Sequence, residues 1–226
     1  MILGKRPSLI NEQALISDAD HGKRILSDEY ALISVYDKTG LETIVGALAR
    51  RLIGIIASGR TAEAIRKMGI QATDVTEYTG SPEMPGGLVK TLHPKIHAGI
   101  LGDWNVPEQR QYLDQQRVHP LSFVIVNLYP FQDVIKKDSS NFRKAVDNID
   151  IGGVALIRAA GKGALLNNRV VPVTSPKYYP TIERELSVKG RIGTELRAEL
   201  VNEAFKVTSA YDTAIHDYFV NYKRRS

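Results

Sequence analysis

The chain has no cysteine, and this absence excludes disulfide bonds, thiolate catalysis and metal sites built on sulfur. It also has no apolar run near the roughly 20 residues that cross a bilayer. No apolar stretch at the N-terminus resembles a signal peptide. We therefore expect a protein of the reducing cytoplasm with no membrane segment.

Two kinds of binding motif are also missing. Neither GxGxxG nor GxxxxGKS/T occurs, which argues against a dinucleotide-binding domain or a nucleotide-hydrolysing P-loop. The five histidines show no convincing metal-ligand spacing, because Pro94 interrupts the pair His93 and His97. We therefore expect no metal site.

The charges nearly balance, with 30 Lys and Arg against 25 Asp and Glu, which gives a net charge of +5. Only residues 222–226 form a basic cluster, and aromatic residues do not alternate with basic ones as they do in proteins that bind single strands. Nucleic acid is therefore disfavoured as the main partner, and a small anionic ligand suits the composition better.

The length of 226 residues, 43% of them hydrophobic, suffices for one large domain. Residues 1–28 combine Pro, Gly and charged residues with only short apolar patches, so we interpret them as an N-terminal extension. The domain then occupies residues 29–226, beginning with an apolar run of strand length at 30–36.

Strand-like runs, polar turns and amphipathic helices alternate along the domain. We expect strands at 30–36, 52–57, 123–128 and 170–173, the last near the sheet edge because of its proline. Thr39 and Glu42 fit a capping box before the first helix. The expected helices are at about 41–51, 62–68, 107–117, 140–148, 153–160, 178–186 and 194–222, with a long structured loop at 69–104 that contains a helical turn or two near His97. This order predicts an α/β fold, a three-layer parallel sheet with helices on both faces.

In such a sheet, ligands bind beyond the carboxyl ends of the strands, and two turns lie there. Ser58, Gly59, Arg60 and Thr61 lie between a strand and a helix, where free backbone NH groups favour a phosphate. Lys38 adds a cation at the end of the first strand. Ordinary turn chemistry explains each turn equally well, but together they favour a small-anion or nucleotide site.

Other polar residues have the character of an active site, although each has a structural alternative. Lys90 stands in the long loop, and Asn127 and Tyr129 follow a strand. Asp150 precedes a helix and could be its cap, while Lys90 and Lys162 could be surface charges. Tyr129 and Asn127 could serve only packing and turn formation.

Several motifs together show a family pattern. They are DKTG at 37–40, PEM at 82–84, VKTLHP at 89–94, HAGIL at 97–101, NLYPF at 127–131, IDIGG at 149–153, RAAGK at 158–162 and AYDTAI at 210–215. In order and spacing this set resembles the inosine monophosphate cyclohydrolase domain, the N-terminal half of a bifunctional purine biosynthesis enzyme. The likeness runs from about Ala31 to Tyr218. The family's larger formyltransferase half has no counterpart here, so we expect a stand-alone cyclohydrolase.

The resemblance implies a methylglyoxal-synthase-like fold and the last step of inosine monophosphate synthesis. In that step the carboxamide nitrogen of 5-formamidoimidazole-4-carboxamide ribotide attacks the formyl carbon, and water is released. The resemblance implies no cofactor and no metal. It also implies a homodimer and a separate formyltransferase that supplies the substrate.

The family pattern also implies roles for individual residues. Asp150 would take or hold the carboxamide proton, and Lys162 would orient and polarise the carboxamide. Lys90 and Tyr129 would stabilise and protonate the formyl oxygen. The implied substrate contacts are Tyr36, Lys38, Ser58, Gly59, Arg60, Thr61, Thr91, Asn127, Ile151, Gly152 and Gly153.

The chain departs from the family pattern at four positions. Leu88 replaces a usual arginine and Arg60 a usual glycine, so we hypothesise that the Arg60 guanidinium supplies the phosphate contact that leucine at position 88 cannot make. Tyr36 replaces a usual serine and Gly163 a common asparagine, which bears on fine substrate positioning.

Two alternatives share this fold. One is a non-catalytic purine-nucleotide-sensing module, like the regulatory domain of carbamoyl phosphate synthetase. Pure binding does not need Lys90, Tyr129, Asp150 and Lys162 together, so their presence disfavours it. The other is methylglyoxal synthase, whose extra acidic active-site residues are not found at the family's spacing.

Overall fold

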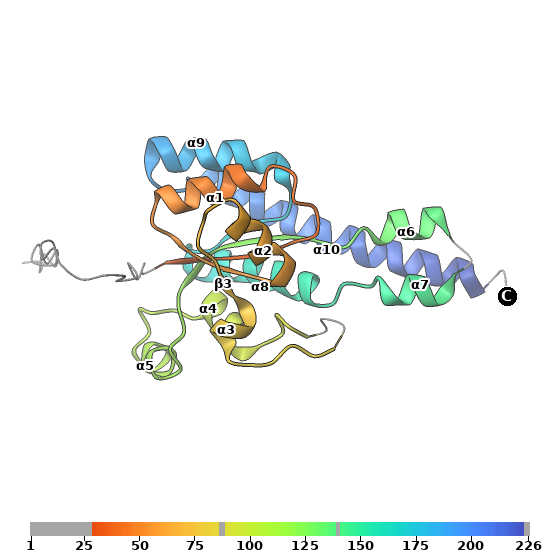
Figure 1. The fold of residues 1–226 in the computed structure, drawn as a ribbon, viewed down its shortest axis with the longest axis horizontal. Helices are drawn as coiled ribbons and strands as arrows, with labels where there is room; N and C mark the ends of the chain where they lie inside the picture. The colour runs from red at the N-terminus through yellow and green to blue at the C-terminus, as the bar shows by residue number, and fades with distance from the viewer. Residues whose placement is uncertain (1–28, 86–88, 139–140, 224–226) are drawn as a thin grey trace, which may run out of the picture.

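The computed structural model describes residues 29–85, 89–138 and 141–223, so the expected extension at 1–28 and the position of Leu88 lie outside it. Its centre is a sheet of five parallel strands in the order β3-β2-β1-β4-β5 (Figure 1). The strands are β1 (Tyr30–Val35), β2 (Gly54–Ala57), β3 (Thr73–Asp74), β4 (Leu121–Asn127) and β5 (Val171–Val173).

Helices cover both faces of this sheet, as expected for three layers (Figure 1). On one face α1, α2, α9 and the start of α10 share a core with the strands, and on the other α3, α4, α8 and a later part of α10 do so. The helices are α1 (Leu41–Arg50), α2 (Gly59–Lys67), α3 (Val75–Thr79), α4 (Pro94–Leu101), α5 (Pro107–Gln115), α6 (Phe131–Lys137), α7 (Phe142–Asp147), α8 (Gly152–Asn167), the 3-10 helix η2 (Pro176–Tyr178), α9 (Tyr179–Lys189) and α10 (Thr194–Lys223).

The long helix α10 runs past the sheet, and α6 and α7 lie against its distal half (Figure 1). A third, largely aromatic core forms there around Phe131, Tyr211 and Tyr218. The Phe131 ring meets both tyrosine rings edge-on, with centroids 6.2 and 5.9 Å away. This distal core supports the two chain segments, before α6 and after α7, that carry Tyr129 and Asp150.

Strand predictions were accurate where apolar residues run continuously, because both faces of the sheet are covered. Six of the seven residues of β4 are buried. Strand β5 lies at the sheet edge, as its proline predicted. The short strand β3 and helix α3 lie within the region that we expected to be a long loop.

The predicted capping box at the start of α1 is wrong. Gly40, in the left-handed conformation with φ 66°, occupies the N-cap position and makes no side-chain cap. The Thr39 hydroxyl instead donates a hydrogen bond of 2.7 Å to Asp37 Oδ1. Asp37 therefore closes the turn with its own side chain, as aspartates do in local turns.

Two helix boundaries differ from the prediction, and one helix was missed. Helix α2 begins at Gly59, because Ser58 is extended and serves as the N-cap. Helix α6 was missed, since Pro130 looked like a breaker although it stands at the N-cap position. Helix α8 continues past Ala160 to Asn167, with Gly161, Gly163 and Ala164 buried in its packing.

Candidate active site

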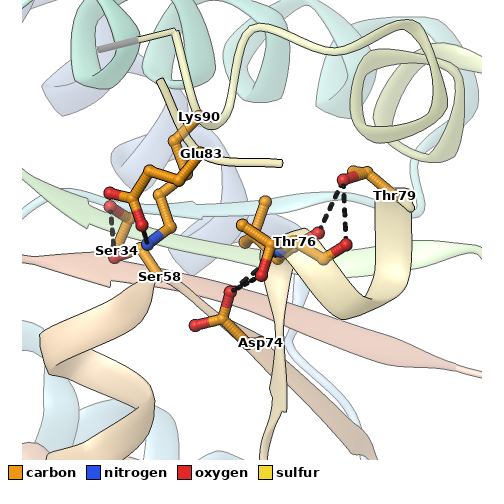
Figure 2. Close-up of polar contacts among 8 residues, drawn as sticks. Ser34, Ser58, Asp74, Thr76, Thr79, Glu83 and Lys90 are labelled. Atoms are coloured by element: carbon orange, nitrogen blue, oxygen red, sulfur yellow. Dashed lines mark hydrogen bonds and ion pairs between the residues drawn. The ribbon is translucent and has the colours of Figure 1, made fainter. Parts of the chain in front are cut away.

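The carboxyl ends of β1, β2 and β4 meet at one edge of the sheet, and side chains tie their turns together. The hydroxyls of Ser34 and Ser58 lie 3.0 Å apart, which joins the ends of β1 and β2 (Figure 2). Asn127 Oδ1 accepts hydrogen bonds from the backbone NH groups of Tyr36 (2.7 Å) and Asp37 (2.9 Å), and its Nδ2 donates to the Asp37 carbonyl (2.8 Å). Asn127 therefore fixes the turn after β1, a role beside its predicted contact with substrate.

Two other predicted binding residues are also occupied by contacts within the fold. The Thr61 hydroxyl donates to the Val35 carbonyl at 3.2 Å and accepts from the Val35 NH at 3.4 Å, and Thr61 is buried. Lys38 Nζ lies 3.4 Å from the carbonyls of Val35 and Tyr36. Thr61 thus joins α2 to β1, while Lys38 stays beside the exposed turn.

The Lys90 amine lies at the N-terminus of α2. A Cβ added to Gly59 would stand 2.7 Å from Lys90 Nζ, so glycine at this position leaves room for the amine. The Lys90 side chain is only 11% exposed, and its Nζ pairs with Glu83 Oε2 at 2.9 Å (Figure 2). A cation and the free NH groups of a helix start therefore face the same space, which suits an anion.

The charge of Lys90 also acts on a neighbouring carboxylate. Burial opposes ionisation of Asp74, but hydrogen bonds from Thr76 and the charges of Lys90 and Arg66 outweigh it and lower the pKa of Asp74. Asp74 caps α3 by accepting from the Thr76 NH and hydroxyl at 2.8 and 2.7 Å (Figure 2). Asp74 is thus an ionised carboxylate that caps α3 close to Lys90.

Tyr129 stands at the end of β4 and is 40% exposed. Its hydroxyl accepts a hydrogen bond of 3.1 Å from Arg60 Nη2, and its ring contacts that of Tyr36 with centroids 5.0 Å apart. Its backbone NH points to Asp150 Oδ2 at 3.5 Å. Tyr129, Arg60, Tyr36 and Asp150 therefore form one cluster at this edge.

Asp150 is held from two directions. Its Oδ1 accepts a hydrogen bond of 2.7 Å from the Gly153 NH at the start of α8, and its own NH donates to the Tyr211 hydroxyl at 2.7 Å. Burial raises the pKa of Tyr211 to about 12, so its phenol stays neutral near pH 7. Asp150 is therefore not the N-cap residue of α8, which is Ile151, but its side chain still binds the helix start through Oδ1, while Oδ2 faces Tyr129.

The segment after Lys90 lies against the same helix start. A Cβ added to Gly152 would stand 2.7 Å from Thr91 Oγ1, which places the buried Thr91 directly over the turn that follows Asp150. Ile151, between them, exposes 63% of its surface. Lys90, Thr91 and the Asp150 turn are therefore neighbours in the fold.

Lys162 is the one predicted catalytic residue outside this cluster. It lies on the exposed side of α8, ten residues after Gly152, which is about 15 Å along the helix axis. Within the described residues, no hydrogen bond or ion pair joins it to Asp150. Its predicted role stays a prediction based on the family pattern.

Two residues of the site were missed by sequence reasoning. Glu83 pairs with Lys90, and Tyr211 holds the Asp150 turn, yet neither was assigned a role. Both lie in segments that carry the family pattern, PEM at 82–84 and AYDTAI at 210–215. Their place in these motifs was the sequence signal that could have identified them.

Neither a metal centre nor a membrane span is found in the described part of the chain. No group of three or more His, Asp or Glu side chains there is arranged to hold a metal ion. No helix in the same residues has both the length and the hydropathy needed to span a membrane.

The structure is thus a doubly wound α/β protein whose polar side chains, gathered at the carboxyl ends of the strands, suit a small anionic ligand. Residues 40–155 match the model of the MGS-like domain, and residues 164–226 match that of the AICARFT/IMPCHase bienzyme. The first match covers more than half of the chain, so the chain belongs to the MGS-like domain family. This confirms the expected fold class.

Individual relatives agree with both matches. The chain is 43% identical over 192 residues to the bifunctional purine biosynthesis protein PurH of Rippkaea orientalis, covering 84% of this chain and 37% of the relative. The PurH of Halalkalibacterium halodurans is 39% identical over 191 residues, with the same coverage. The chain therefore spans little more than a third of the length of these relatives. The solved structure described as "Crystal structure of ForH" superposes with a TM-score of 0.73 at 26% identity, covering 85% of this chain and all of that one.

Proposed function

We propose that the chain is an inosine monophosphate cyclohydrolase, which closes the ring of 5-formamidoimidazole-4-carboxamide ribotide with release of water. The observation that carries the proposal is that Tyr129 and Asp150 are neighbours, with the Tyr129 NH 3.5 Å from Asp150 Oδ2, at the edge of the sheet where Lys90 also lies. The similarity to proteins named for purine biosynthesis supports the substrate class.

The ribose phosphate is proposed to bind at the start of α2. The Lys90 amine and the turn of Ser58 and Gly59 offer it charge and hydrogen bonds, with Thr61, Lys38 and Thr91 around them. The turn at 151–153 and the side chains of Asn127 and Tyr36 are proposed to hold the base.

Ring closure needs one proton removed from the carboxamide nitrogen and one added to the formyl oxygen. Asp150 Oδ2 is suited to the first task, since its other oxygen holds the helix start and fixes the carboxylate. Tyr129 is suited to the second, assisted by the charge of Lys90. The new hydroxyl then takes a second proton and leaves as water, while the former formamido nitrogen loses its proton and the C=N bond of the ring forms. The reaction transfers no electrons to or from the substrate, so it requires no redox cofactor.

Lys162 remains in the proposal on the basis of the family pattern alone. We also propose a homodimer, a cytoplasmic location and a formyltransferase as the pathway partner that forms the substrate. A size measurement by light scattering tests the dimer directly.

Glu83→Gln is expected to strengthen nucleotide binding. The Glu83 carboxylate, 43% exposed at its side chain, pairs with the Lys90 amine that the substrate phosphate would use. Exposed ion pairs are worth about 0 to 1 kcal/mol, so the Kd for inosine monophosphate should fall by up to about fivefold. Calorimetric titration measures this, with Glu108→Gln on α5 as the matched control. Weaker binding would mean that Glu83 helps to hold the ligand.

Lys90→Ala is expected to lower kcat/KM for the formamido ribotide about 100-fold. The amine both faces the phosphate site and supports the developing charge on oxygen. The control is Lys67→Ala, which removes an exposed lysine at the C-terminal end of α2, the helix whose N-terminus Lys90 faces. It should leave kcat/KM unchanged.

The assay is the change in absorbance as inosine monophosphate forms. Turnover by the unmodified protein that Lys90→Ala reduces would support the cyclohydrolase. Tight nucleotide binding without turnover would instead support the sensing module as the function of the chain.

A further inference from the structure

Arg60 occupies an unusual place for a cation. It lies in the first turn of α2, which contains no acidic residue, and this end of a helix carries the positive end of the dipole. Anionic or neutral residues are favoured there, so helix stability does not account for an arginine. Its side chain instead crosses from the end of β2 to the end of β4.

The contact that it makes there has a defined direction. Arg60 Nη2 lies 3.1 Å from the Tyr129 hydroxyl oxygen. A guanidinium has five N–H donors and no acceptor, so the phenol must be the acceptor in this hydrogen bond. The phenol proton is therefore not used by Arg60 and remains available to another group.

Other contacts restrict where that proton can point. The Tyr129 ring lies against Tyr36, with centroids 5.0 Å apart, and its backbone NH faces Asp150. The ring is held on these sides, yet 40% of Tyr129 is exposed. The hydroxyl can thus donate its proton on its exposed side, to a ligand bound there.

We propose that Arg60 is a positioning residue that makes Tyr129 a proton donor toward the reacting oxygen. The proposal rests on the proposed function above. As the bond between the carboxamide nitrogen and the formyl carbon forms, the carbonyl electron pair moves to oxygen, which takes the Tyr129 proton. Asp150 takes the proton from nitrogen. The phenolate that remains lies beside the guanidinium charge and regains a proton from water.

A double-mutant cycle tests this role, using the unmodified protein, Arg60→Ala, Tyr129→Phe and the double variant. Arg60→Ala should lower kcat about tenfold or more and change KM by less than about threefold, because it acts after binding. In the Tyr129→Phe background the same change should have little further effect, because the hydroxyl through which Arg60 acts is gone. Arg60→Lys should recover part of kcat, since an ammonium also donates.

A direct contact between Arg60 and the substrate phosphate predicts another pattern. Arg60→Ala would then raise KM with kcat unchanged, by the same factor with or without the Tyr129 hydroxyl, and this would overturn the proposal. Melting curves of all four proteins check that the variants are folded, as expected for an exposed side chain.

The two proposals can fail separately. An active unmodified protein in which the two changes are additive overturns the role of Arg60 alone. If the protein binds inosine monophosphate without turnover, the cyclohydrolase proposal fails. The Kd for inosine monophosphate is then measured for the same four proteins. Coupling between Arg60 and Tyr129 in Kd would then support the pairing, and additivity would overturn it. An unmodified protein that shows neither binding nor turnover overturns both proposals.

Discussion

Asp150→Asn should reduce kcat for ring closure by about 10² to 10⁴ while the fold is retained. Asparagine keeps an oxygen that can accept from the Gly153 NH, so the contact with the start of α8 survives. The substitution removes the negative charge and the ability to take a proton. It therefore separates the proposed catalytic role of this carboxylate from its contact with the helix start.

The measurement combines single-turnover kinetics with a melting curve. Removal of the charge near the helix start should cost only about 0.3 to 1 kcal/mol, so Tm should change by a few degrees. Asp114→Asn on α5 is the matched control and should leave kcat unchanged. Full activity in Asp150→Asn would leave the contact with the helix start as the only role of Asp150.

Phe131→Ala is expected to have the largest effect on stability, a decrease of about 3 to 5 kcal/mol in the free energy of unfolding. Phe131 is 1% exposed and forms the centre of the distal core with Tyr211 and Tyr218. Activity should fall as well, because Tyr211 is the residue that holds the Asp150 backbone.

Phe142→Ala provides the matched control in denaturant unfolding. Phe142 contacts Phe219 and Tyr222 at the rim of the same core but is 45% exposed. Its removal should cost clearly less than that of Phe131. Equal decreases for the two variants would contradict the central place of Phe131.

The sheet was predictable from the sequence because its strands are continuous apolar runs that both faces bury. Local polar signals were less reliable. Thr39 matched a capping box, yet its hydroxyl donates instead to the carboxylate of Asp37, two residues earlier in the chain. Pro130 suggested a break in structure, although a helix begins directly after it.

The candidate site was predictable as a set of residues but not as a set of contacts. The phosphate contact of Arg60 stays a prediction, but its hydrogen bond to the Tyr129 hydroxyl, 69 positions away in the chain, was not predicted. Such pairs depend on which turns the sheet order brings together, and periodicity contains no such information. The place of Lys162 was also not predictable from the sequence. The predicted helix ended at residue 160, whereas α8 continues through Lys162 to Asn167.

The bond from the Asp150 NH to Tyr211 links the chemistry to the longest helix of the described chain. An amide proton exchanges with deuterium only when its hydrogen bond opens, so the exchange rate of the Asp150 amide reports local opening at Tyr211 on α10. This part of the helix therefore supports the Asp150 backbone, while the Gly153 NH holds its carboxylate. Loosening of α10 around Tyr211 would therefore also loosen the turn that carries Asp150 at the edge of the sheet.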